Sequence, residues 1–128
     1  MTDTQNPTKK VFVVEDDVFL SSIMTSKITD HHFDVQAFGS GEAFMEALKT
    51  TLPDVLILDI FLPGKNGLEI LKELRSDDRT KNLPVFVISN TDEKKDRDTA
   101  TELGAKFIIK AVTDPDEIVK EISTVFTH

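Results

Sequence analysis

The stretch VLILDIFLP at residues 55–63 places one ionisable side chain, Asp59, between two apolar segments. An ionised carboxylate is rarely left in apolar surroundings, because removing it from water is costly unless a cation or hydrogen-bond donors compensate. We therefore expect residues 55–58 to form a buried strand. Asp59 should lie at the carboxyl end of that strand, in a crevice beside positive charge.

The composition indicates one globular domain with an acidic surface. The chain has 128 residues, of which 39% are hydrophobic and 30% are charged, and this suits a single core. Its 23 acidic and 15 basic residues give a net charge of -8, which repels phosphodiester backbones and anionic lipids. We expect no nucleic-acid or membrane partner. The absence of cysteine excludes disulfides, thiolate metal sites and cysteine nucleophiles.

No segment has the length or composition of a signal peptide or a membrane span. A membrane helix needs about 20 apolar residues in a row, and the longest apolar runs are as short as residues 55–58. A cytoplasmic protein is therefore expected. The polar residues 1–10 are expected to form a flexible tail, and residues 11–126 to form the folded domain.

Short aliphatic and β-branched runs alternate with longer stretches of helical periodicity, which predicts five strands and five helices. The strands are expected at residues 11–14, 33–37, 55–58, 85–88 and 107–109. Strands that alternate with helices and are apolar on both faces indicate a parallel sheet covered on two sides. The fold class is therefore α/β.

The fourth helix has the weakest sequence pattern. It is expected over residues 91–103, with Asn90 as the capping residue and Glu93 completing a capping box. Its apolar stripe is little more than Ala100 and Leu103. We expect this helix to be the least firmly packed of the five.

Polar side chains follow four of the five predicted strands. In chain order they are Glu15, Asp16 and Asp17 after the first strand, Asp59 after the third, Ser89 after the fourth and Lys110 after the fifth. Ligands of such sheets bind outside the carboxyl ends of the strands. We therefore expect these side chains to lie along one rim.

Each of these residues also has a purely structural interpretation. Acids directly after a strand commonly cap the next helix. Ser89 could start a turn, and Lys110 could be an ordinary surface lysine. Asp59 could be a buried, hydrogen-bonded acid that stabilises the following loop. That alternative is the weakest, because perturbed buried acids often mark functional sites.

The three carboxylates Glu15, Asp16 and Asp59 would be neutralised by one divalent cation together with Lys110. Mg²⁺ suits such a site, because it prefers oxygen ligands and commonly bridges to phosphoryl oxygens. A carboxylate beside Mg²⁺ and a lysine can attack phosphorus, and Ser89 could contact the oxygens of the product. Asp59 is therefore the candidate phosphoacceptor.

Four short motifs stand in order along nearly the whole chain: VVED at residues 13–16, LD at 58–59 with Pro63 and Gly67 downstream, IS at 88–89, and Lys110. Together they resemble the receiver domain of bacterial two-component response regulators. The resemblance implies a doubly wound, flavodoxin-like five-stranded parallel sheet of order 2-1-3-4-5 flanked by five helices. It also implies a receiver domain over residues 11–126 with no output domain, either free-standing or cut from a longer protein.

The same resemblance implies a role for each residue of the rim. Asp59 would accept a phosphoryl group from the phosphohistidine of a histidine kinase or phosphotransfer protein. The ligands of Mg²⁺ would be Asp16 and Asp59 directly, Glu15 largely through water, and the backbone carbonyl of Phe61. The domain would be regulatory, assisting only its own phosphorylation and dephosphorylation.

In the family's switch, Ser89 and Lys110 contact the phosphoryl group, and the aromatic residue at the position of Phe107 moves inward. The output surface would be the fourth helix, fifth strand and fifth helix, which a downstream protein target reads. The resemblance is also compatible with formation of a homodimer when the domain is activated.

The sequence departs from the family pattern near the rim. Ala111 replaces the usual proline after the lysine, and we expect a trans bond there because a non-proline cis bond costs ~2.5–4 kcal/mol. Asn90 stands where a very small residue is usual, and either narrows the entrance for phosphate or donates a hydrogen bond. Phe61 and Thr91 offer no charged group to orient an attacking water, so our hypothesis is slow self-dephosphorylation.

Three other functions remain open from the residues alone. A flavin-binding module would share the fold, but it needs an uncharged phosphate loop where this chain has three acids. A phosphotransfer or hydrolase enzyme would need a further acid for its leaving group. The third is a phosphate-independent, receiver-like interaction scaffold. His31 and His32 fall in a turn away from the rim and are interpreted as surface residues.

Overall fold

The structure is a computed structural model that describes residues 8–126. Most of the expected tail, residues 1–7, lies outside the described residues. The strands are β1 (Lys10–Val14), β2 (Asp34–Phe38), β3 (Val55–Asp59), β4 (Val85–Ser89) and β5 (Lys106–Ile109). The helices are α1 (Val18–Asp30), α2 (Gly41–Leu48), α3 (Gly67–Ser76), α4 (Lys94–Glu102) and α5 (Pro115–Thr124), with a short 3₁₀ helix, η2 (Lys110–Val112), before α5.

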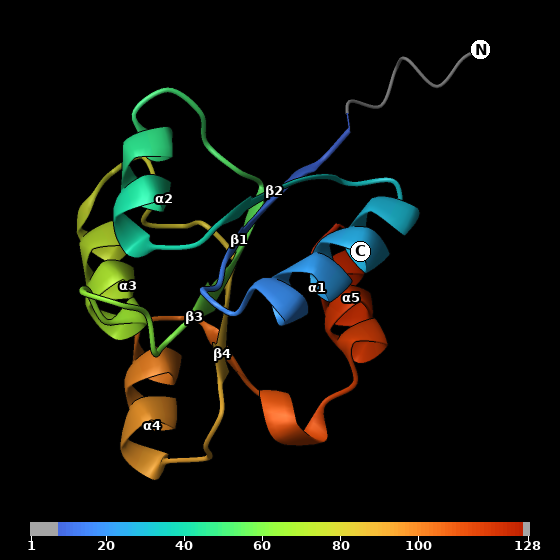
Figure 1. The fold of residues 1–128 in the computed structure, drawn as a ribbon. Helices are drawn as coiled ribbons and strands as arrows, with labels where there is room; N and C mark the ends of the chain where they lie inside the picture. The colour runs from blue at the N-terminus through green and yellow to red at the C-terminus, as the bar shows by residue number, and fades with distance from the viewer. Residues whose placement is uncertain (1–7, 127–128) are drawn as a thin grey trace.

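The strands form one parallel sheet in the order β2-β1-β3-β4-β5, which confirms the predicted fold class and strand order. Helices α1 and α5 cover one face, and α2, α3 and α4 cover the other (Figure 1). No helix within residues 8–126 has both the length and the apolar composition needed to cross a membrane.

Along β1 and β3, successive side chains point to opposite faces of the sheet, and they fill a core on each side. Phe12, Leu56 and Leu58 belong to the cluster under α2, α3 and α4, whereas Val13 and Ile57 belong to the cluster under α1 and α5. Every residue of β3 and β4 is buried, as expected for central parallel strands covered on two sides.

Two local expectations were wrong. The edge strand β2 is not apolar on both faces, because Asp34, Gln36 and Ala37 are exposed. Helix α4 begins at Lys94 and not at 91, and Glu93 precedes it without a side-chain capping bond. The Oγ atom of Ser89 instead accepts a hydrogen bond from the Thr91 amide, so this segment forms a turn before the helix starts.

Candidate functional site

The register of the sheet brings the carboxyl ends of four strands to one level. Val14 pairs with Leu58, Asp59 with Ile88, and Ser89 with Ile109. Glu15 and Lys110 each follow the last residue of their strand. Side chains more than 90 positions apart in sequence, such as Glu15 and Lys110, therefore meet at one rim.

Asp59 is almost fully buried, with 2% of its surface exposed, and each of its carboxylate oxygens has a donor. The Phe61 amide donates to Oδ1 at 3.2 Å, and the Lys110 ammonium donates to Oδ2 at 3.0 Å. A charged donor together with a backbone amide compensates for the burial of a carboxylate. The crevice and the positive charge expected for Asp59 are both present.

Glu15 is the second buried acid of the rim. Its Oε2 accepts a hydrogen bond from the Asp17 amide at 3.0 Å, and its Oε1 lies 2.7 Å from Nζ of Lys110. Burial raises the pKa of Glu15 above its ordinary value, and the nearby Asp59 acts in the same direction. Burial by itself lowers the pKa of Lys110, but pairing with the two carboxylates outweighs it, so this pKa is raised. Lys110 is therefore charged at neutral pH.

Glu15, Asp16 and Asp59 form a group that could hold a metal ion, and we call it the acidic cluster. One carboxylate oxygen from each lies within 4.8 Å of the others. The donors fit Mg²⁺, because they are all carboxylates and Asp16 is exposed, which leaves room for bound water. Glu15 Oε1 is buried, and its only partner among the described residues is the Lys110 ammonium at 2.7 Å, so this oxygen keeps a lone pair for a cation or its bound water.

Asp17 is not part of the acidic cluster. Its Oδ1 accepts hydrogen bonds from the amides of Phe19 at 3.0 Å and Leu20 at 3.2 Å, so it caps α1 as predicted. Of the three consecutive acids, one caps the helix and the other two turn toward Asp59.

Neither Ser89 nor Phe107 contacts the acidic cluster in the contacts that the structure describes. Ser89 is fully buried, and its Oγ accepts a hydrogen bond from the Thr91 amide at 3.2 Å. Phe107 is half-buried against the core on the α3 and α4 side of the sheet. Ser89 therefore does form the turn that its structural interpretation suggested, and its hydroxyl hydrogen is still free to be donated.

A tight loop after β3 shapes the rim. The Gly67 amide donates to the Ile60 carbonyl at 2.8 Å, and a Cβ atom at Gly67 would lie only 2.1 Å from the backbone oxygen of Asp59. Only glycine permits this approach. The loop then enters α3 through a capping box formed by Asn66 and Glu69.

The peptide bond between Lys110 and Ala111 is trans, as expected, since the described residues contain no cis bond. Residues 110–112 form the 3₁₀ helix η2. Together with Phe61 and Asn90, Ala111 lines the hollow above the acidic cluster, which has a volume of about 490 Å³.

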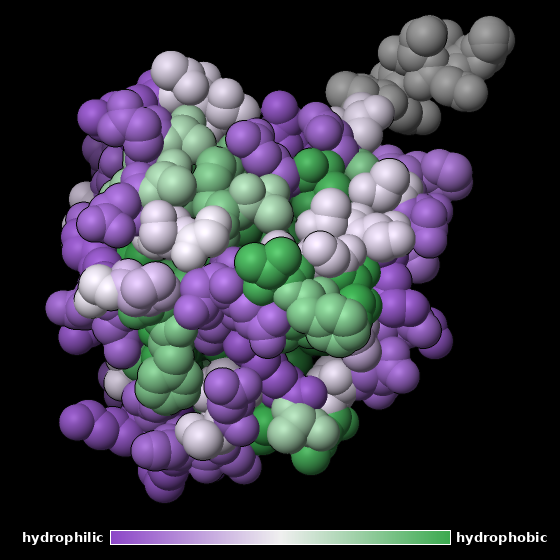
Figure 2. Space-filling view, in the orientation of Figure 1, coloured by the Kyte–Doolittle hydropathy of each residue, from purple (hydrophilic) through white to green (hydrophobic). Residues whose placement is uncertain are grey.

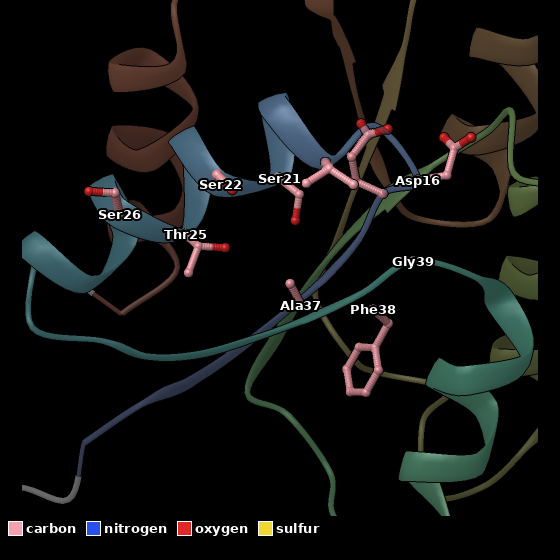
Figure 3. A pocket seen from close by; sticks show the side chains of 10 residues that line it. Asp16, Ser21, Ser22, Thr25, Ser26, Ala37, Phe38 and Gly39 are labelled. Atoms are coloured by element: carbon pink, nitrogen blue, oxygen red, sulfur yellow. The ribbon is translucent and has the colours of Figure 1, made fainter.

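A second hollow, also of about 490 Å³, adjoins the cluster between α1 and β2. Figure 3 shows Asp16 at one end of it and the side chains of Ser21 and Thr25 projecting from α1 toward Ala37. These small polar side chains leave the Asp16 side of the cluster open.

Exposed apolar side chains lie on the segments that border the site, and their exposure was not predicted from the sequence. Val18 and Phe19 at the start of α1 are 77% and 76% exposed, Val112 in η2 is 77% exposed, and Phe61 is 48% exposed. Figure 2 shows hydrophobic surface over α1 and near η2, bordered by hydrophilic surface. For Val18 and Phe19, the position outside the buried stripe of α1 was the available signal. We call Val18, Phe19, Phe61 and Val112 the apolar rim.

Comparisons with known proteins agree with this geometry. Residues 11–123 match the model of the response regulator receiver domain. The phosphate regulon transcriptional regulatory protein PhoB of Rhizobium meliloti is 32% identical over 108 residues, which is 84% of this chain and 48% of that protein. The DNA-binding response regulator MtrA of Mycobacterium tuberculosis is 28% identical over 89% of this chain and 49% of its own length. The chain thus spans about half the length of these relatives.

Solved structures share the fold. A putative response regulator from Chloroflexus aurantiacus aligns with a TM-score of 0.86 at 24% identity, over 95% of this chain and 100% of that one. The chemotaxis response regulator CheY4 of Vibrio cholerae aligns with a TM-score of 0.83 at 20% identity, over 93% and 99%. With the family model covering almost the entire folded region, the chain belongs to the response regulator receiver domain family.

Proposed function

We propose that this receiver domain accepts a phosphoryl group on Asp59 from the phosphohistidine of a histidine kinase or phosphotransfer protein. The observation that supports this most directly is the position of Asp59. It is a buried carboxylate, held by Lys110 at one oxygen and by the Phe61 amide at the other, inside a cluster of two further acids. A carboxylate held at both oxygens has a fixed orientation, which favours its attack on phosphorus.

Mg²⁺ is the cofactor we propose, with Asp16 and Asp59 as direct ligands, Glu15 as a ligand largely through water, and the backbone carbonyl of Phe61 as a further ligand. When bound, Mg²⁺ neutralises the acids and the charge of the transferred group. The buried Glu15 Oε1, whose only described partner is Lys110, and the exposed side chain of Asp16 support this assignment.

The residues of the chain would divide the transfer between them. An oxygen of Asp59 forms a bond to phosphorus as the bond from phosphorus to the imidazole nitrogen breaks, and the leaving imidazole takes up a proton from solvent water. Lys110 is already charged and within reach, so its ammonium can move from the carboxylates to a phosphoryl oxygen. Ser89 would donate its hydroxyl hydrogen to another phosphoryl oxygen.

The apolar rim is the surface we propose for the protein donor. Exposed apolar patches around a polar site are typical of protein contact surfaces. A donor protein that packs against Phe19 and Val112 would place its phosphohistidine above the acidic cluster and exclude water from it. A small phosphodonor would gain nothing from these contacts.

Activation would be transmitted through α4, β5 and α5 to a downstream protein target, with Ser89 and Phe107 as switch residues. In α4 only Ala100 is buried, so its displacement breaks few apolar contacts. We further propose that the domain acts in the cytoplasm and that a homodimer is one form of its activated state.

The test is intact mass after incubation with Mg²⁺ and acetyl phosphate. One added phosphoryl group is expected for the wild type, and none is expected without Mg²⁺ or for Asp59→Asn. Asp78→Asn is the matched control, because Asp78 is an exposed surface acid. No adduct from either acetyl phosphate or a histidine kinase that phosphorylates other receivers would favour the phosphate-independent scaffold instead.

A further inference from the structure

The side chain of Arg75 on α3 bonds to backbone carbonyls of two other segments, residues 80–83 and the end of α4. Its Nε donates to the Leu103 carbonyl at 2.6 Å. Its Nη1 donates to the carbonyls of Leu83 at 2.8 Å, Thr80 at 3.2 Å and Lys81 at 3.3 Å. No described carboxylate forms an ion pair with Arg75, so its charge is used on main-chain acceptors alone.

The acceptor at Leu103 lies at the end of α4. Leu103 is the C-terminal capping residue of that helix, where carbonyls have no partner within the helix. Gly104 follows with a φ of +75°, and its amide bonds to Thr101 while the Ala105 amide bonds to Ala100, both at 2.9 Å. This is a Schellman turn, and Arg75 ties it to α3.

The opposite end of α4 has no comparable attachment. Glu93 precedes the helix without a side-chain capping bond, and residues 90–95 are all exposed. Within α4 itself only Ala100, near the C-terminal end, is buried. The contacts that hold α4 to the domain are therefore concentrated at the end that Arg75 reaches.

We propose that Arg75 is a positioning residue that fixes the C-terminal end of α4, so that α4 turns about this end when its N-terminal end is displaced. The displacing event rests on the proposed function, because phosphorylation would pull on Ser89 and the 90–93 loop before α4. The guanidinium suits this role because its donors lie on separate nitrogens of a rigid planar fork and so reach carbonyls on two segments, whereas the three donors of an ammonium all lie on one atom.

The first experiment needs no phosphorylation. Amide hydrogen exchange is compared in the wild type, Arg75→Met and the matched control Arg79→Met. Arg79 also donates to a carbonyl at a helix end, that of Leu48, the last residue of α2, but it makes no described hydrogen bond with α4. Arg75→Met should speed exchange at Gly104 and Ala105 by about tenfold or more relative to a core amide such as Leu56, and Arg79→Met should not.

Equal acceleration at Gly104, Ala105 and Leu56 would show only global destabilisation and would overturn the proposal. If Arg75→Met does not fold, Arg75→Lys takes its place, because it keeps the charge but loses the fork. Unchanged protection of Gly104 in Arg75→Lys would likewise overturn a specific role for the guanidinium.

The second experiment follows α4 on activation, and the absence of cysteine makes single-site labelling simple. A spin label is placed at Lys95→Cys or Glu102→Cys, both exposed positions on α4, and beryllofluoride with Mg²⁺ is added. The signal should change at position 95 and stay constant at 102. In Arg75→Met it should change at both.

Movement at 102 equal to that at 95 in the wild type would overturn a fixed C-terminal end. No response at either label, with no phosphoryl adduct on Asp59 by mass, would instead count against the proposed function. Hydrogen exchange would then decide the role of Arg75 alone.

Discussion

Lys110 and Asp59, 51 positions apart in sequence, are joined by a 3.0 Å hydrogen bond between Nζ and Oδ2. The same ammonium lies 2.7 Å from Glu15 Oε1, so one cation holds two nearly fully buried carboxylates. Removing a partner from a buried ion pair leaves an uncompensated charge, which costs more than the pair itself contributes. Lys110 therefore stabilises the metal-free domain as well as serving the proposed chemistry.

Lys110→Met should lower the free energy of unfolding of the metal-free protein by about 3 kcal/mol at neutral pH. The loss should shrink on acidification, because protonating one of the two carboxyls relieves their repulsion. Urea unfolding without Mg²⁺ measures both effects. Lys106→Met is the control, since its exposed pair with Glu121 contributes little. A loss no larger than that of Lys106→Met would contradict the prediction.

The pH dependence of metal-free stability should show the raised pKa of Glu15. Because burial raises this pKa, the folded protein holds the proton more tightly than the unfolded chain does. The resulting stability is fully present below the ordinary glutamate pKa and is lost as the pH rises through the raised pKa of the folded state. Glu15→Gln should therefore reduce the decline in unfolding free energy between weakly acidic and neutral pH.

The control for this measurement is Glu46→Gln, which removes a surface carboxylate paired only with Lys49. It should leave the pH profile unchanged. Lys110 does not interfere, because its raised pKa affects stability only in the alkaline range. Added Mg²⁺ should stabilise the wild type more at neutral than at weakly acidic pH, since it binds ionised carboxylates, and should stabilise Glu15→Gln less.

Phe61→Asn should shorten the lifetime of the phosphoryl group on Asp59. Phe61 is 48% exposed beside the acidic cluster and offers no polar atom beyond its backbone, whereas an asparagine amide could orient an attacking water. The decay of the phosphorylated mass after removal of acetyl phosphate measures this. Leu52→Asn is the control, because Leu52 is similarly exposed but does not line the hollow above the acidic cluster. An unchanged lifetime in Phe61→Asn would count against the hypothesis of slow self-dephosphorylation.

The sequence predicted most of the sheet because its signals there are local. Apolar runs of four residues in β1, β3 and β4 mark central strands, and an acid such as Asp59 at a strand end indicates a rim. The start of α4 was wrong because Asn90 and Glu93 resemble a capping box, while Ser89 uses its hydroxyl to form a competing turn.

Contacts between distant backbone segments left no signal in the sequence. Arg75 bonds only to main-chain carbonyls, so no complementary acid marks its partners. Thr80 is 1% exposed, and its hydroxyl donates to the Leu74 carbonyl at 2.6 Å, although its neighbours Arg79 and Lys81 are exposed. Such positions follow from the path of the chain in three dimensions, which residue type and periodicity do not specify.

Gly67→Ala should destabilise the domain and reduce phosphorylation together. The added methyl would lie 2.1 Å from the Asp59 carbonyl oxygen and 2.9 Å from the Ile60 Cα, and both are backbone atoms of a buried segment that cannot move aside. Overpacking of this kind costs about 1–3 kcal/mol and displaces the backbone that bears Asp59. Gly39→Ala is the matched control, because a Cβ there meets no atom within 4 Å. We expect a lower urea midpoint and a slower gain of phosphoryl mass in Gly67→Ala alone. Equal behaviour of the two variants would mean that the loop after β3 does not hold Asp59 in place.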